Sequence, residues 1–324
     1  MTKKKKTVLC EMAFWEKFSE CFPASMPFPD DRAQEKLSTW IEVYRFLSRS
    51  NLRVDCSAAR FAEVAQKDSR LYYLWKKSTE DKDALDFLDS FSNHTDFLSR
   101  NPFCTLLSGK GVGPLARQYG VININGGNCL TKNALFIDNG QALHKDDVWS
   151  WEDFGKRIPE KASNSMIIVD NYILRNGVKD LYEILNLLLP DKCEIGYHLT
   201  IFYSEASSVT EEKILNEIGR RKPELIQNLQ FELIHVVGTQ EFHDRAIITN
   251  NYWISVGGGF DIAKWDSGIR SLVVKRSTTT EIAFPYFASS RIAKIDDAYE
   301  NLIQDAKIAL SHANTSSRNR LLTQ

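Results

Sequence analysis

The sequence predicts an α/β fold in the second half of the chain, a sheet flanked by helices, behind a first half that is mostly helical. Short apolar runs typical of strands occupy residues 165–170, 197–203 and 231–237. Two stretches with apolar residues at helical spacing separate these runs. An order of strand, helix, strand, helix, strand favours a largely parallel sheet with helices packed against it.

The helices of this half are predicted by periodicity and by their end signals. Apolar residues recur at helical spacing after the first strand, and a proline ends the helix. These residues are Val178, Leu181, Ile184, Leu185, Leu188 and Pro190. A capping box of Ser208 and Glu211 predicts the start of the next helix. A last amphipathic helix is expected at about residues 296–312.

The most informative functional signal is a predicted β-hairpin after the third strand. Because side chains alternate between the two faces of a strand, His243 and Arg245 point the same way. Asn250 and Asn251 suit a tight turn, since asparagine tolerates positive φ. The glycines at 257–259 then allow another group to approach the backbone closely.

The spacing of these residues resembles the phospholipase D superfamily, whose motif is a His-x-Lys-x-x-x-x-Asp segment followed by Gly-Ser-x-Asn. His243 stands at the histidine position, Arg245 at the lysine and Asn250 at the aspartate. Gly257 and Gly258 stand at Gly-Ser. The His-Asp-Arg version is closer to the phospholipase-D-like domain at the C-terminus of MIT-domain proteins. The resemblance covers roughly residues 163–290 and implies a phospholipase-D-like mixed sheet.

The resemblance implies a metal-independent and cofactor-independent phosphodiesterase. In active members a histidine attacks phosphorus and forms a covalent intermediate, which assigns nucleophilic attack to His243. Arg245, Gly257 and Gly258 would bind the phosphate, and Asn250 would complete the catalytic set. Single-motif members obtain the second histidine from a partner chain as homodimers. The protein would then be a divergent homodimeric nuclease, in bacterial defence or a mobile element.

A non-catalytic binding module is the alternative reading of the same residues. Asn250 cannot supply the negative charge of aspartate, and Gly258 and Phe260 lack the hydrogen-bonding side chains of the family motif. Arg245 can still bind phosphate, because a guanidinium matches oxyanion geometry. Such a module would bind a phosphorylated ligand or a protein partner without turnover. The sequence leaves both readings open.

Three further residues are candidates for a cleft beside this motif. Asp170 and Tyr172 follow the first strand, and clefts in open α/β sheets form at the carboxyl ends of strands. Asp170 suits equally well a cap on the turn that follows. Asp261 would either pair with Arg245 or close the glycine-rich loop.

Composition sets limits on the class of protein. The chain has 324 residues, enough for two domains, which we expect at 1–160 and 161–324. The net charge of −1 argues against a global basic field for nucleic acid but not against a local groove. The six cysteines are dispersed, which favours reduced thiols in a cytoplasmic protein over disulfides or zinc. No apolar stretch reaches transmembrane length.

The first half carries structural signals but no motif with an assignable role. Its expected elements are helices at 31–49, 61–77, 84–91 and 149–158, strands at 121–124 and 134–137, and a linker at 159–164. The glycine-rich segment 109–113 lacks the spacing of a nucleotide-binding loop.

Overall fold

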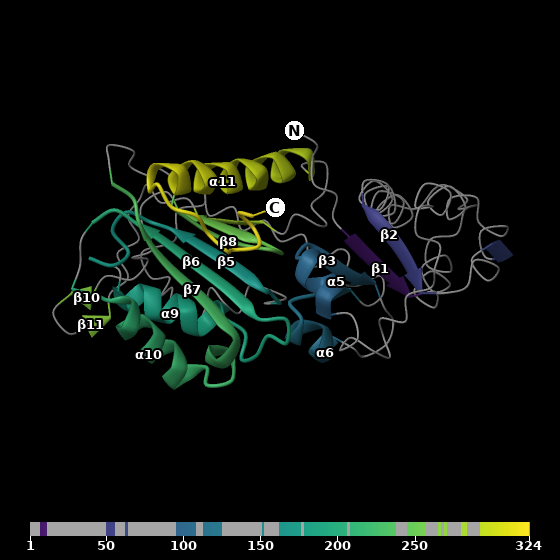
Figure 1. Cartoon of the computed structure of the whole chain (residues 1–324), viewed down its shortest axis with the longest axis horizontal. Helices are drawn as coiled ribbons and strands as arrows, with labels where there is room; N and C mark the ends of the chain where they lie inside the picture. The colour runs from purple at the N-terminus through teal and green to yellow at the C-terminus, as the bar shows by residue number, and fades with distance from the viewer. Residues whose placement is uncertain are drawn as a thin grey trace. The chain divides into compact units, whose positions relative to one another are not determined.

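The computed structural model divides the chain into two units (Figure 1). The first comprises residues 1–134 and 286–292, and the second comprises 135–285 and 293–324. The boundary expected at residue 160 falls inside the second unit. The described residues are 7–11, 50–55, 62–63, 95–107, 113–124, 151, 162–175, 178–205, 208–237, 245–256, 265–266, 269–270, 280–283 and 292–323.

The described part of the first unit is built on a parallel sheet with the strand order β2-β1-β3-β4. Its strands are β1 (Thr7–Glu11), β2 (Asn51–Asp55), β3 (Cys104–Leu107) and β4 (Ile122–Ile124). Two short helices, α5 (Thr95–Arg100) and α6 (Gly113–Gln118), precede and follow β3. The strand expected at 121–124 is confirmed.

Three strands of this sheet, β1, β2 and β3, were not among the elements that we expected in the first half of the chain. The strands β1, β2 and β3 are four or five residues long, and long segments separate β1 from β2 and β2 from β3. Parallel strands so far apart leave no local hairpin signal in the sequence. The elements expected at 31–49, 84–91 and 134–137 lie outside the described residues, as do 61–77 and 149–158 except for residues 62–63 and 151.

The second unit contains a six-stranded mixed sheet with the order β12-β9-β8-β5-β6-β7. Its parallel strands are β5 (Ser165–Val169), β6 (Tyr197–Tyr203) and β7 (Leu229–His235). The antiparallel strands are β8 (Arg245–Thr249), β9 (Trp253–Val256) and β12 (Thr280–Ala283). A separate two-stranded ribbon joins β10 (Trp265–Asp266) to β11 (Ile269–Arg270). The α/β class and the strands at 165–170 and 197–203 are confirmed.

Helices cover both faces of this sheet. Figure 1 shows α9 (Val178–Leu188) and α10 (Glu211–Arg221) on one side and α11 (Ile292–His312) on the other. The apolar residues that predicted α9 are the ones it buries, namely Leu181, Ile184, Leu185 and Leu188. On the opposite face, the Tyr299 hydroxyl of α11 donates to the carbonyl oxygen of Thr249 in β8. The core therefore lies in two layers, above and below the sheet.

Two predicted boundaries are each wrong by two residues. The N-cap of α10 is Thr210, whose hydroxyl accepts a hydrogen bond from the Lys213 amide, so Ser208 and Glu211 form no capping box. Thr210 has the extended backbone that a cap requires. The third strand runs over 229–235 instead of 231–237, because the 3-10 helix Leu225–Asn228 leads directly into it.

The expected linker at 159–164 is wrong for its last three residues, which belong to the second unit. Ala162, Ser163 and Asn164 are buried. The amide of Asn164 donates to Oδ1 of Asn250 at 2.9 Å, and its carbonyl oxygen accepts from the His198 amide at 3.1 Å. These bonds fix the entry to β5 against two other strands.

The segment after α11 is fastened to the amino ends of the parallel strands. Nδ2 of the buried Asn319 donates to the Met166 carbonyl oxygen at 3.0 Å and to the Thr200 hydroxyl at 3.1 Å. The Arg320 guanidinium donates to the carbonyl oxygens of Ile195 and Gly196. This end of the sheet is thus closed by the protein's own chain.

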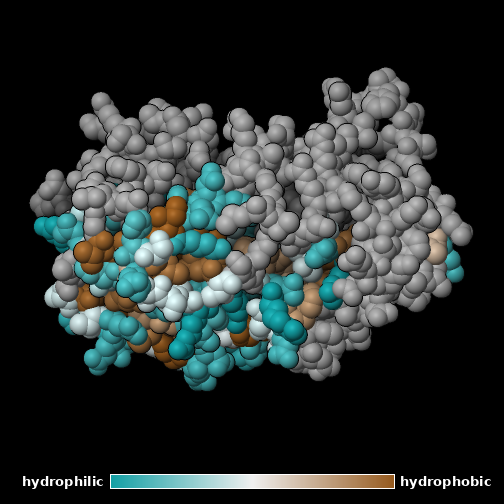
Figure 2. Space-filling model, turned by 45° about the horizontal axis from the view of Figure 1, so that its top comes forward, coloured by the Kyte–Doolittle hydropathy of each residue, from teal (hydrophilic) through white to brown (hydrophobic). Residues whose placement is uncertain are grey.

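The described surface offers no broad apolar face. Its exposed large hydrophobic residues are Leu115, Val237 and Ile308. Figure 2 shows hydrophobic residues interspersed with hydrophilic ones over the described part of the visible face. Among the described helices, none has the length and apolar character needed to cross a bilayer.

Candidate functional site

The candidate site lies where the parallel strands of the second unit end. The carboxyl ends of β5, β6 and β7 share one edge of the sheet because these strands run in the same direction. β8 runs antiparallel to β5 and pairs Ala246 with Val169, which brings the preceding Arg245 to that edge. We call this the carboxyl edge and define it by Asp170, Tyr172, Ser204, Glu205, His235 and Arg245. Ligand clefts of open α/β sheets form at such edges.

Asp170, Tyr172 and Arg245 form the centre of the carboxyl edge. Asp170 is only 3% exposed, and its Oδ1 accepts a hydrogen bond from the Tyr172 amide at 2.7 Å. The same oxygen lies 3.5 Å from Nε of Arg245. The Arg245 guanidinium carbon lies 5.4 Å from the centroid of the Tyr172 ring, within cation–π range. Asp170 therefore caps the turn after β5, as one reading predicted, and also pairs with Arg245.

The hydrogen-bonding capacity of Arg245 is largely unused. Its Nε is buried and has no hydrogen-bond partner, because the contact with Asp170 is too long to count as one. Its two terminal nitrogens make no hydrogen bond with any described residue. Guanidinium carries five N–H donors, and a buried donor without a partner costs about 1–3 kcal/mol. Such unsatisfied groups require an explanation in a folded protein.

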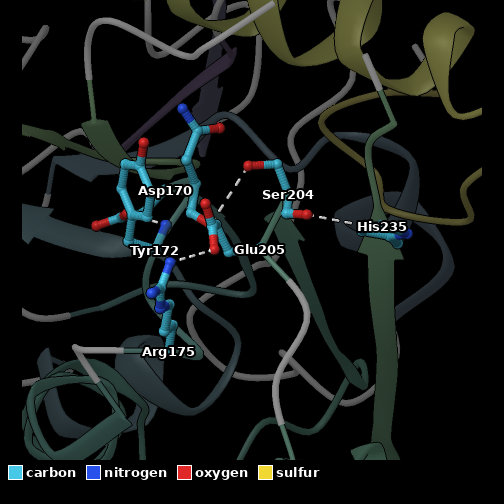
Figure 3. Close-up of polar contacts among 7 residues, drawn as sticks. Asp170, Tyr172, Arg175, Ser204, Glu205 and His235 are labelled. Carbon is cyan, nitrogen blue, oxygen red and sulfur yellow. Dashed lines mark hydrogen bonds and ion pairs between the residues drawn. The ribbon is translucent and has the colours of Figure 1, made fainter. Parts of the chain in front are cut away.

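Polar groups continue along the edge from β5 to β6. The Asn171 carbonyl oxygen accepts hydrogen bonds from the amides of Ser204 at 3.2 Å and Glu205 at 3.0 Å. Nη1 of Arg175 lies 2.5 Å from Oε2 of Glu205 (Figure 3). The two side chains are 57% and 38% exposed, so this ion pair contributes little to stability. Its consequence is that Glu205 neutralises the charge of Arg175 at the edge.

His235 closes the edge at the end of β7. Its ring stacks on Tyr203 of the neighbouring strand, with centroids 5.1 Å apart and an interplanar angle of 29°. Nε2 of His235 lies 2.8 Å from the Ser204 carbonyl oxygen (Figure 3). A carbonyl oxygen only accepts, so Nε2 is the donor of this hydrogen bond. The exposed imidazole is therefore held in one orientation.

The structure does not bring Asn250 to this site. Asn250 follows β8 at the end opposite Arg245, and the five steps along the strand between the two positions amount to about 16 Å. Its side chain is fully buried and accepts from the Asn164 amide. Nδ2 of Asn251 donates to the Ala162 carbonyl oxygen at 2.7 Å. The predicted turn at Asn250-Asn251 is confirmed, but neither asparagine has the positive φ that we expected, and both side chains instead hold the turn by hydrogen bonds.

The remaining predicted site residues, His243, Gly257, Gly258 and Asp261, lie outside the described residues. Sequence reasoning found Asp170, Tyr172 and Arg245, and the structure brings these three together. It assigned no role to Arg175, Ser204, Glu205 or His235. The sequence did contain a signal for two of them: Ser204 and Glu205 directly follow the strand predicted at 197–203, just as Asp170 ends the strand predicted at 165–170.

The described residues offer no metal centre, because no three histidine, cysteine, aspartate or glutamate side chains gather among them. The described part of the site offers an anchored guanidinium, aromatic rings and an oriented imidazole. Comparison of the chain with protein-family models and with curated proteins gave no match.

Proposed function

We propose that the second unit binds the phosphate group of a phosphorylated or phosphodiester ligand at the carboxyl edge, with Arg245 as the principal donor. The observation that carries this proposal is the state of Arg245. Asp170 and Tyr172 hold its guanidinium, while its N–H groups lack hydrogen-bond partners among the described residues.

An arginine held in this way is suited to an oxyanion. Pairing with Asp170 and packing on Tyr172 orient the planar group before a ligand arrives. Phosphate oxygens then satisfy two N–H groups at once in the bidentate geometry that guanidinium prefers. Hydrogen bonds to charged groups contribute about 1.5–3 kcal/mol each, which compensates for the unsatisfied donors of the free protein.

A purely structural ion pair is the competing explanation for Arg245. A structural pair normally satisfies the donors of the arginine through direct hydrogen bonds to the carboxylate. Here the nearest approach is 3.5 Å, and the Asp170 oxygen already accepts from the Tyr172 amide at 2.7 Å. The pairing thus fixes the position of Arg245 without using its hydrogen bonds.

Catalysis is a second candidate function, favoured by the position of His243 two residues before Arg245. If the resemblance to the phospholipase D superfamily extends to activity, His243 attacks the phosphorus bound by Arg245. A phosphohistidine forms, and the leaving alkoxide takes a proton from the second histidine of a homodimeric partner. Water then hydrolyses the intermediate and regenerates His243.

Phosphate titration tests the binding proposal. We expect saturable binding of inorganic phosphate by the full chain, measured by calorimetry or NMR, and about 10- to 100-fold weaker binding by Arg245→Ala. Arg245→Lys should retain part of the affinity, since lysine keeps the charge but loses the planar fork. Arg220→Ala is the matched control, because it removes the same charge from the exposed face of α10. Equal affinity of the wild type and Arg245→Ala would contradict the proposal.

The enzyme and binding readings differ in turnover. We expect a nuclease to cleave DNA, RNA or a simple phosphodiester equally well with and without EDTA, and to lose activity on dilution of the dimer. His243→Ala should then abolish turnover. Phosphate binding at Arg245 without turnover of any of these substrates would establish the binding module.

A further inference from the structure

We infer that the ligand of the carboxyl edge is a single-stranded nucleic acid, one of whose bases stacks on the ring pair of His235 and Tyr203 while Arg245 binds a backbone phosphate. This inference rests on the proposed function and adds the class of ligand and the contacts that recognise it. Neither ring was assigned a role by the sequence.

The ring pair has the geometry of a stacking platform. Tyr203 and His235 are register partners at the ends of β6 and β7, and Tyr203 covers one face of the imidazole. His235 is exposed and lies at the end of β7, the last strand of the described sheet, so an incoming planar group can reach its ring. Stacking of a base on an aromatic side chain contributes about 1–3 kcal/mol and accepts any base.

The platform is fixed before a ligand binds. The hydrogen bond from Nε2 of His235 to the Ser204 carbonyl oxygen, 2.8 Å long, prevents rotation of the ring. Ser204 is in turn held by its bond to the Asn171 carbonyl oxygen. An exposed side chain usually loses rotamer entropy when it stacks on a ligand, and this arrangement has already lost it.

The distance between the two ligand-binding groups, Arg245 and the ring pair, favours a nucleic acid strand over a small phosphorylated compound. Arg245 reaches across to β5, where it meets Asp170 and Tyr172, and His235 lies two strands farther along the same edge. At about 4.8 Å per strand, the phosphate and the ring are roughly 10 Å apart. A nucleic acid strand presents phosphates and planar bases repeatedly and can span this distance within a few nucleotides.

The charges along the edge predict an unusual salt dependence. Each arginine of the edge faces a carboxylate, but Glu205 forms a hydrogen bond with Arg175, whereas the contact of Asp170 with Arg245 forms none, so Arg245 is the arginine that we expect to bind a phosphate. Single strands lose affinity with a slope of about −0.7 per neutralised phosphate in a plot of log K against log salt. We therefore expect a slope between about −0.7 and −1.4, shallower than that of a basic nucleic-acid groove.

The test compares oligonucleotides with and without bases. Fluorescence anisotropy would measure binding of a labelled single-stranded oligonucleotide, its abasic counterpart and the matching duplex to the full chain. We expect the base-containing strand to bind about 5- to 100-fold more tightly than the abasic strand. The duplex should bind less tightly than the single strand, because its bases are stacked on each other.

Variants of the platform separate stacking from phosphate binding. His235→Ala should lower the affinity for the base-containing strand to that for the abasic strand, whereas His235→Phe should retain the preference for bases. Gln230→Ala is the matched control, since Gln230 is exposed on the same strand but near its opposite end. If His235→Ala acted only by disturbing the fold, the affinities for the base-containing strand, the abasic strand and the duplex would all fall by the same factor.

The outcomes distinguish this inference from the proposed function. Phosphate binding that depends on Arg245, with equal affinity for the base-containing and abasic strands, would overturn the inference and leave the proposed function intact. Tighter binding to vesicles with phosphomonoester headgroups than to any oligonucleotide would also overturn it. Absence of phosphate binding would overturn both.

Discussion

Asp170 and Arg245 should be energetically coupled, and the structure sets the size of the effect. The charges are 3.5 Å apart, which at an effective dielectric constant of about 20 gives an attraction of about 5 kcal/mol. Desolvation of Asp170, whose side chain is 4% exposed, offsets much of this attraction. Buried pairs cost about 3–5 kcal/mol when broken and exposed pairs about 0–1 kcal/mol. With the Arg245 side chain 19% exposed, we expect a coupling of about 1–3 kcal/mol.

A double-mutant cycle measures this coupling. Urea unfolding of the full chain would be followed by fluorescence and circular dichroism for the wild type, Asp170→Ala, Arg245→Leu and the double variant. Leucine replaces the guanidinium beside Tyr172 by an apolar side chain, so that the cycle reports the charge interaction with Asp170. The double variant should be less destabilised than the sum of the single variants. The exposed pair of Glu217 and Arg220 on α10 serves as the control and should give under about 1 kcal/mol. A coupling below about 0.5 kcal/mol at Asp170 would refute the idea that this carboxylate holds Arg245.

Three further predictions concern the stability of the second unit. Burial and the nearby Arg320 lower the pKa of His198 from 6.5 to about 4, so the unfolded state binds the extra proton between these values. Stability should therefore be full above about pH 6.5 and fall by about 1–3 kcal/mol toward pH 4, and His198→Gln should remove this slope in pH-dependent unfolding. Thr210→Ala should cost about 1 kcal/mol in urea unfolding, whereas Ser208→Ala should have almost no effect. Asn319→Ala should cost about 3 kcal/mol or more, because it removes buried hydrogen bonds to the Met166 carbonyl oxygen and from the Leu321 amide; a loss below 1 kcal/mol would show that these bonds do not hold the C-terminal segment against the sheet.

The sequence predicted the second unit better than the first, because the elements of the second unit have local sequence patterns, whereas the strands of the first unit depend on pairing between distant segments. The helix α9 and the strand β6 match their predicted bounds, since each has a continuous apolar pattern bounded by turn residues. The strands of the first unit pair with partners far along the chain, and a short parallel strand has no hairpin turn to mark it. Long-range pairing, not local propensity, decides such elements.

The capping of α10 shows a limit of a different kind. Ser208, Thr210 and Glu211 all carry side chains that favour helix starts, and the sequence alone ranks the Ser208 capping box first. The structure selects Thr210 because the helix that packs Ile214 and Ile218 into the core begins at Glu211. Packing of the buried face thus decides between local signals of similar strength.

The composition of the carboxyl edge depends on one topological choice that the sequence does not reveal. Consecutive strands are neighbours in most sheets, so β8 would be expected beside β7, which precedes it in the chain. In that arrangement Arg245 would meet His235. Instead β8 pairs with β5, and Arg245 meets Asp170 and Tyr172, some 75 residues earlier in the sequence.

The pairing of β8 with β5 also separates Arg245 from His235 along the carboxyl edge. Because β5 and β6 lie between β8 and β7, the guanidinium of Arg245 and the imidazole of His235 face different parts of any ligand. Had β8 lain beside β7, both groups would have contacted one phosphate, and an intrachain pair of catalytic groups would have been possible. With β5 and β6 between these strands, His235 is too distant to share the phosphate held by Arg245, and we propose that it serves as a platform for a neighbouring group. A histidine that acts on that same phosphate must therefore come from elsewhere, and His243 is the candidate that the sequence places two residues from Arg245.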